Sequence, residues 1–158
     1  MELSALADNK AGIMISVNSI IISVVLTVLL RKLDDQPYLV IPTILMIVVN
    51  ISTIIFAILA TRPKIVAGNF TEEDIKNRKI NMLFFGHFSK MSLEGYQQGI
   101  MQMLKEKDYL YESLTKDIYY LGVVLGKKYK YLRISYTIFM YGLIASVVAF
   151  GLAMLLHS

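Results

Sequence analysis

The segment Lys127-Lys-Tyr-Lys-Tyr-Leu-Arg133 decides the fold, because a charged, tyrosine-rich sequence changes there into an unbroken apolar one. The residues that follow, Ile134 to Leu156, carry no charge and are numerous enough to cross about 30 Å of hydrocarbon. Cations bind phosphate head groups, and tyrosine rings collect at the membrane surface. The segment therefore predicts a membrane-interface anchor that consists of Lys127, Lys128, Tyr129, Lys130, Tyr131 and Arg133. The apolar run disfavours the alternative, a basic face on a soluble helix.

Two earlier runs are also uncharged and long enough to span a membrane. The first is Ala11 to Leu30, and the second is Leu39 to Ala60. The polar residues Arg31 to Gln36 between them predict a tight hairpin. A cleaved signal peptide is the alternative for the first run, but a second span follows at once and no small-residue cleavage site separates the two. We therefore expect an N-terminal head and a two-span hairpin over residues 1–60.

The composition also indicates a membrane protein. Hydrophobic residues make up 56% of the 158, and the mean hydropathy is +0.57, which is too apolar for the surface of a soluble domain of this length. The chain has no cysteine and only two histidines, so we expect no disulfide, no metal site and no cofactor. A net charge of +4 suggests nucleic acid, but the cations gather beside the spans. We therefore expect membrane lipid, and not nucleic acid, as the partner of this charge.

Residues 61–133 are too polar to span and predict a helical insertion. Thr71 can cap a helix from Glu72 to about Lys79, since acidic residues follow it in the first turn. A break is expected between Gly86 and Met91. Ser92 can then cap a helix from Leu93 to about Lys105, with one apolar position every fourth residue on one face, namely Tyr96, Ile100 and Leu104.

The last predicted helix is long. Asp108 is a good N-cap, and no proline follows it. Apolar residues then recur at helical spacing at Leu110, Leu114, Ile118, Leu121, Leu125, Tyr129 and Leu132. This stripe runs into the third span, residues 134–158 with the tail, so we expect one helix of about 49 residues whose first half lies in water. The predicted fold is an all-α integral membrane protein: a two-span helical hairpin, a helical cytoplasmic insertion, and a third span continuous with a long amphipathic helix.

The distribution of cations predicts the orientation. Ten lysines and arginines flank the insertion close to the spans: Arg62, Lys64, Lys76, Arg78, Lys79, Lys116, Lys127, Lys128, Lys130 and Arg133. Cytoplasmic loops carry such an excess. We expect the insertion and the N-terminus in the cytoplasm of a bacterial cell, the C-terminus outside, and three crossings of the inner membrane.

Small and hydroxyl-bearing residues form stripes on the predicted spans. The first span has Gly12, Ser16, Ser19, Ser23 and Thr27, the second has Thr43, Asn50, Thr53, Ala57 and Ala60, and the third has Gly142, Ala145 or Ser146, Ala149 and Ala153. Such faces allow helices to pack closely. Asn18 and Asn50 are the only amides in the spans, and they need hydrogen-bond partners within the bundle or across subunits. The spans hold no charge, so a simple bundle and a pore both stay open, and a pore would require a homo-oligomer.

No catalytic constellation is recognisable in the insertion, and we therefore expect no enzyme activity. Arg78, Lys79 and Lys90, together with His87, can meet a phosphate group, which makes these four residues the candidate ligand-binding site. The alternatives are a solvated or lipid-facing surface for the cations and a packed or surface position for the histidine. At the mouth of the first span, Asp8 and Lys10 can pair with each other or with residues 127–133 and so latch the bundle; a helix cap and a head-group anchor are the alternative roles.

Several segments resemble the Pycsar transmembrane effector family. They are Ala7-Asp8-Asn9-Lys10-Ala11-Gly12-Ile13 with its Asp-x-Lys-Ala motif, Asn81-Met-Leu-Phe-Phe-Gly-His-Phe, Met91-Ser-Leu-Glu, Asp117-Ile-Tyr-Tyr-Leu-Gly and Leu125-Gly-Lys-Lys-Tyr. The resemblance covers essentially the whole chain in the order two spans, insertion, third span. Some relatives carry an N-terminal HD-type phosphohydrolase domain. This chain begins directly at the Asp-x-Lys motif, so hydrolase activity is not expected to carry over.

The resemblance implies a bacterial antiphage effector. In such systems a partner pyrimidine nucleotide cyclase makes cyclic UMP or cyclic CMP during infection, and the effector responds by impairing the inner membrane. The rival interpretations are a passive membrane anchor and oligomerisation module of a signalling system, and an enzyme that acts at the interface without a recognisable site.

Overall fold

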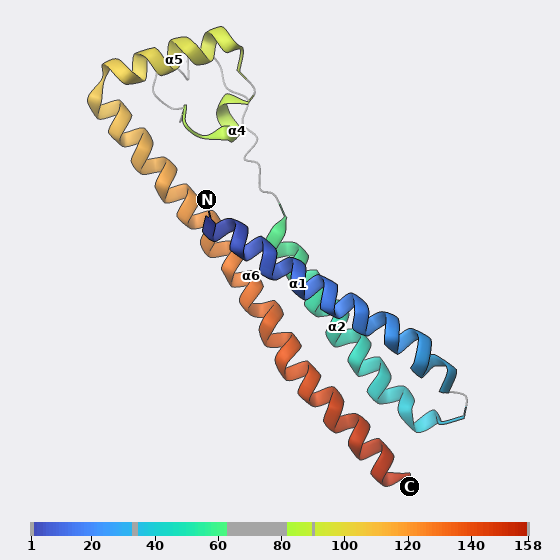
Figure 1. Cartoon of the computed structure of the whole chain (residues 1–158). Helices are drawn as coiled ribbons and strands as arrows, with labels where there is room; N and C mark the ends of the chain where they lie inside the picture. Colours follow the sequence, from blue (N-terminus) through green and yellow to red (C-terminus); the bar gives the residue numbers. More distant parts are fainter. Residues whose placement is uncertain (1, 33–34, 63–81, 90, 158) are drawn as a thin grey trace. The chain divides into compact units, whose positions relative to one another are not determined.

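The computed structural model describes residues 2–32, 35–62, 82–89 and 91–157. All of the elements in these ranges are helices, which confirms the all-α fold class. In chain order they are α1 (Glu2–Val24), the π-helical turn η1 (Val25–Leu29), the 3-10 turns η2 (Leu30–Lys32) and η3 (Pro37–Leu39), α2 (Val40–Thr61), α4 (Phe85–Phe88), α5 (Leu93–Lys105) and α6 (Lys107–Leu156) (Figure 1). Three of these helices are long and apolar enough to cross a membrane.

The chain divides into two compact units. Unit 1 comprises Met1–Arg62 with Leu125–Ser158, and unit 2 comprises Pro63–Val124. The predicted helix from Asp108 to Leu156 is confirmed as a single helix, α6, of 50 residues, or about 75 Å at 1.5 Å per residue. It begins one residue earlier than predicted, so Asp108 lies in its first turn, where a carboxylate is stabilised by the helix dipole.

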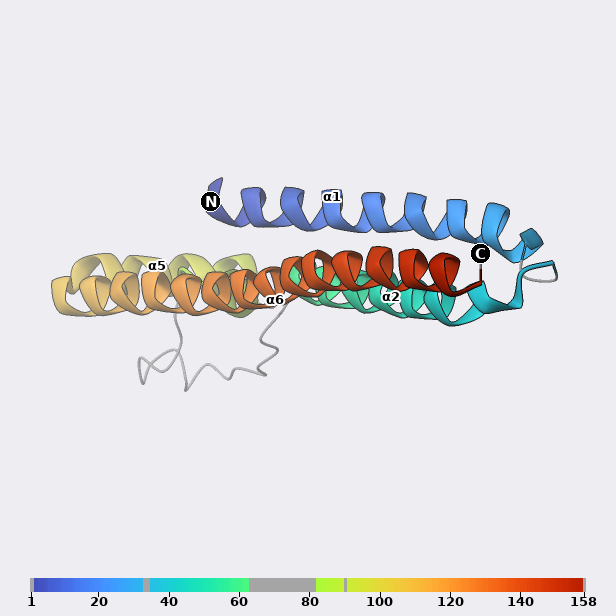
Figure 2. The ribbon, with the colours of Figure 1, turned by 90° about the horizontal axis from the view of Figure 1, so that it is seen from below.

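Within unit 1, α1 and α2 form an antiparallel hairpin (Figures 1 and 2). Ala7 and Ala11 of α1 lie in one buried cluster with Ala57 and Ala60 of α2 and with Leu132 of α6. Alanine has no side chain beyond Cβ, so helices that meet at alanines can approach closely and gain dispersion contacts in a solvent that offers no hydrophobic driving force. The small residues therefore determine which faces of the helices meet.

The N-terminal head predicted over residues 1–10 is part of the first helix, which begins at Glu2. Leucine, alanine and glutamate dominate the start of the chain, and all three are good helix formers. Pro42, predicted to disturb the second span little, lies in the first turn of α2, where its missing N–H would have no partner in the helix.

The second half of α6 contacts the rest of unit 1 at several separate points. The Ser135 hydroxyl donates to the Thr53 carbonyl at 2.9 Å, and Ser135 is completely buried. At the far end, the ring of His157 stacks on Tyr38, with centroids 4.7 Å apart. Between these contacts, Gly142 lies directly against Val49, and a methyl group added at Gly142 would overlap the Val49 side chain.

The contact at Gly142 gives a prediction about stability. We expect Gly142→Ala to lower the free energy of unfolding by about 1–3 kcal/mol, because Val49 must move out of a packed position. Gly151→Ala is the matched control on the same helix, since nothing lies within 4 Å of its added methyl group. Unfolding of the detergent-solubilised protein by SDS, followed by circular dichroism, measures both variants. Equal stability of the two variants would contradict the packing described here.

Unit 2 contains α4, α5 and the first part of α6. Ser92 caps α5 as predicted, since its Oγ accepts from the Gly95 N–H at 3.1 Å, and the helix has the predicted bounds. The predicted apolar face was one residue off. Leu104 is exposed, whereas Met103 is buried with Met82 and Tyr109. Positions four apart drift by about 40° per step around a helix, so the buried face passes from Tyr96 to Met103 rather than to Leu104. The helix predicted from Glu72 to Lys79 and its cap Thr71 lie outside the described residues.

Candidate functional site

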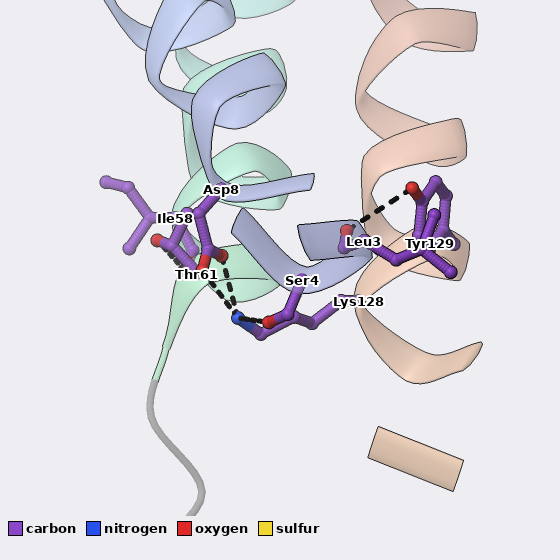
Figure 3. A network of polar contacts seen from close by, with 7 residues as sticks. All are labelled: Leu3, Ser4, Asp8, Ile58, Thr61, Lys128 and Tyr129. Atoms are coloured by element: carbon purple, nitrogen blue, oxygen red, sulfur yellow. Dashed lines mark hydrogen bonds and ion pairs between the residues drawn. The ribbon is translucent and has the colours of Figure 1, made fainter. Parts of the chain in front are cut away.

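An ion pair joins α1 to α6 within unit 1. The Lys128 Nζ lies 2.7 Å from Asp8 Oδ1 and 2.8 Å from Asp8 Oδ2, and it also donates to Ser4 Oγ at 3.0 Å (Figure 3). Ser4 and Asp8 are four residues apart, so one face of α1 presents both oxygen acceptors to the ammonium group. All three donor hydrogens of the lysine can therefore be used by this one helix.

The two side chains of this ion pair are exposed to water to different extents. The Lys128 side chain is 17% exposed, whereas that of Asp8 is 42% exposed. A largely buried ammonium group loses hydration, and here two charge-assisted hydrogen bonds and one neutral acceptor replace it. Removal of Asp8 would leave this charge without a counter-ion, which costs more than the loss of a fully exposed pair.

The rest of the predicted membrane-interface anchor divides into two sets. Tyr129 and Tyr131 pack against the alanine cluster, and the Tyr129 hydroxyl donates to the Leu3 carbonyl at 3.4 Å (Figure 3). The cations Lys127, Lys130 and Arg133 are exposed. One side of this segment thus holds α1, and the other side presents charge that suits lipid head groups.

Of the two residues predicted at the mouth of the first span, the structure pairs Asp8 with Lys128 and leaves Lys10 exposed on α1. A sequence signal for Lys128 existed. Leu121, Leu125, Lys128 and Leu132 follow helical spacing, so a lysine occupies a position in an apolar stripe. The predicted stripe passed through Tyr129 instead, which is one residue away.

Three of the four predicted ligand-binding residues lie outside the described residues, namely Arg78, Lys79 and Lys90. His87 lies on the short helix α4, and its ring meets Phe84 edge to face, with centroids 5.1 Å apart. This contact agrees with the packed position considered as the alternative for His87, and the four-residue site stays a prediction.

The small-residue stripes of the spans differ in their surroundings. Every member of the second stripe is buried, from Thr43 to Ala60. The first stripe, from Gly12 to Thr27, is exposed, so the prediction that it packs is wrong within one chain. Its hydroxyls donate to carbonyls four residues back, at Ser19, Ser23 and Thr27. A hydroxyl that is hydrogen-bonded within its own helix can face hydrocarbon at little cost in free energy. The larger amide of Asn18 would cost more free energy there. Asn18 is accordingly buried, on a face of α1 other than that of the serines.

The third stripe lies mainly inside. Ser146 is buried, while Gly142, Ala149 and Ala153 are partly buried and Ala145 is exposed. The structure thus selects Ser146 over Ala145, the two residues that the sequence left as alternatives. The hydroxyl of Ser146 donates to the Gly142 carbonyl at 2.8 Å, which leaves the inner face of the helix smooth for packing.

Comparison with known protein families gives a match over nearly the whole chain. The family model described as the Pycsar effector protein domain matches residues 1–156, which include all three candidate membrane spans and the Asp8–Lys128 pair. A search of curated proteins and a search of solved structures find no match. The family links the chain to antiphage defence and to cyclic nucleotide signalling. With three helices able to span a membrane and this match over nearly its whole length, the chain belongs to the Pycsar effector family and is a membrane protein.

Proposed function

We propose that this protein is an antiphage membrane effector that cyclic UMP or cyclic CMP activates and that then impairs the bacterial inner membrane as a homo-oligomer. The observation that carries the proposal is the family match over residues 1–156, which takes in the insertion and the three spans together. A partner pyrimidine nucleotide cyclase supplies the ligand. The protein itself needs no enzyme activity in this scheme, because ligand binding alone shifts its conformational equilibrium.

The Asp8–Lys128 pair is the part of the structure best suited to hold the resting state. It joins α1 to α6 by a contact that is partly shielded from water. A nucleotide can favour the open state only if it binds that state more tightly. In our proposal the ligand binds in the insertion, where Arg78, Lys79, His87 and Lys90 are the candidate residues, and the shift travels along α6 to Lys128.

The homo-oligomer is supported by two exposed faces. The hydroxyl-bearing face of α1 from Gly12 to Thr27 permits close approach of another helix in lipid. On α6, Leu114, Ile118 and Leu121 are exposed, and 14 residues further along the same face lie the buried Leu132 and Ser135. This face of α6 is packed in the second half of the helix and exposed in the first half, and an exposed apolar face of this kind favours association with a second copy of the chain.

The proposed orientation follows the cations. Lys127, Lys130 and Arg133 are exposed where the insertion ends and the last span begins. Anionic lipids of the cytoplasmic leaflet attract such residues, and the K/R excess of the insertion favours the same side. We place the N-terminus and residues 61–133 in the cytoplasm, and the C-terminus outside.

Nucleotide binding combined with dye leakage from liposomes tests the proposal. We expect purified full-length protein to bind cyclic UMP or cyclic CMP and the leak rate to rise about 10-fold or more on addition of that nucleotide, which lies within the usual range of allosteric coupling. Cyclic AMP and cyclic GMP serve as controls. A protein that neither binds nor leaks would favour the passive anchor and oligomerisation module, and turnover of the nucleotide would favour an enzyme.

A further inference from the structure

Two amides are buried in the α1–α2 hairpin, and the side-chain oxygen of each has no hydrogen-bond donor among the described residues. Asn18 is 0% exposed and Asn50 is 2% exposed. Each side-chain nitrogen donates to the carbonyl four residues back, Asn18 to Met14 and Asn50 to Met46, both at 2.7 Å. A backbone carbonyl only accepts, so each amide nitrogen must face its own helix and each Oδ1 must face away from that carbonyl.

The register of the hairpin is consistent with the two amides lying at about the same depth. Ala11 and Ala57 belong to one buried cluster. Asn18 follows Ala11 by seven residues, and Asn50 precedes Ala57 by seven, which is about two helical turns or 10 Å in each case. Because the helices are antiparallel, both steps lead in the same direction along the same interface. Residue 49 is the midpoint of the candidate span Pro37–Thr61, so the pair lies near the middle of the bilayer.

No group in the part of the chain that the structure describes donates to either Oδ1. The buried hydroxyls of unit 1 cannot do so, because each one already donates its single hydrogen to a backbone carbonyl; these are Thr43, Thr53, Ser135 and Ser146. A buried acceptor without a donor is costly, and hydrocarbon offers none. The two asparagines therefore present two hydrogen-bond acceptors, and the donor for them must come from outside the side chains of the hairpin.

We infer that Asn18 and Asn50 form a binding site for one water molecule, which donates one hydrogen bond to each Oδ1. Water has two donor hydrogens and matches two acceptors at one depth. A cation fits less well, because two neutral amide oxygens do not replace its hydration shell and the backbone carbonyls here serve the helices. The site fixes the register of α1 against α2 and places one bound water molecule inside the otherwise apolar bundle. The inference is independent of nucleotide activation.

Solid-state NMR of the full-length protein in bilayers, with labelled asparagine, tests this site. Magnetisation transferred from water should reach the side-chain amides of Asn18 and Asn50, and Asn18→Leu should remove the transfer at Asn50, as Asn50→Leu should at Asn18, because a water with a single partner is not retained. Asn9, an exposed amide on the same helix, should stay hydrated in all variants. Dry amides in the parent protein, or hydration at one amide that survives loss of the other, would overturn the inference.

Unfolding measurements provide a second readout. Either single substitution should lower the folding equilibrium constant about 10-fold through the partner left unsatisfied, and the double variant should lose no more than a single one. Additive losses would overturn a shared site. Stability that changes when Na⁺ and K⁺ are replaced by N-methyl-D-glucamine would assign the site to a cation instead. Transfer from water that vanishes on dilution of the protein in lipid would assign the donor to a second copy.

Discussion

Asp8→Lys should make the membrane leak without nucleotide. The substitution places two ammonium groups face to face at Lys128, whose side chain is only 17% exposed, and we expect unit 1 to lose about 1–3 kcal/mol of stability. If the pair holds the resting state, this loss shifts the population toward the leaking state by a factor of about 5–150. The measurement is dye leakage from liposomes in the absence of nucleotide, together with growth of cells that express the variant.

The exchange Asp8→Lys with Lys128→Asp should restore low leakage, because it rebuilds the pair in reverse. Glu2→Lys is the matched control, since it makes the same charge change on the same helix at an exposed position. Lys10→Glu tests the other candidate at this mouth. If Lys10→Glu leaks as much as Asp8→Lys, Lys10 also contributes to holding the resting state. If the double exchange still leaks, packing rather than charge holds α6 in place.

Ile118→Glu with Leu121→Glu should abolish both the oligomer and the nucleotide-dependent leak. These residues are 70% and 55% exposed, so the fold of one chain should tolerate the change. Full burial of one such side chain is worth about 1.5–3 kcal/mol, and placing two carboxylates per chain at the contact should weaken association at least about 100-fold. Cross-linking in liposomes at several protein-to-lipid ratios measures the oligomer.

Tyr120→Glu is the control for this prediction. Tyr120 is 55% exposed and lies two residues beyond Ile118, which is about 200° around the helix, so it is on the opposite side. It should leave association and leakage close to the parent values. Full cross-linking in the Ile118→Glu and Leu121→Glu variant would exclude this face of α6 from the oligomer and leave the exposed face of α1 as the remaining surface.

The elements that the sequence predicted well are those with local signals. Ser92 caps α5 because its side chain meets an N–H three residues away, and no distant contact is required. The length of α6 was predictable for a similar reason, since neither proline nor a capping glycine interrupts the chain after Asp108. Span lengths follow from bilayer thickness, which is a property of the solvent rather than of the tertiary fold.

The choice of faces was harder, because it depends on partners that are far away in sequence. On α1 the serine stripe and the Asn18 face are both compatible with packing, and only the position of α2 decides between them. Lys128 and Tyr129 differ by 100° around α6, and the distinction rests on Asp8, which lies 120 residues earlier. The pairing of Asp8 with residues 127–133 could be anticipated as one alternative, but the partner within that segment could not.

The stacked rings of Tyr38 and His157 have a mechanical consequence when they are considered together with the ion pair. They fasten the residue that follows α6 to η3, just before α2, and Lys128 lies 29 residues before His157, or about 44 Å along the helix axis. If α6 pivots about the stacked rings, a tilt of only about 5° moves Lys128 by about 4 Å, which is more than a hydrogen bond can span. A small angular change of a stiff rod is thus sufficient to release the far end while the near end stays attached.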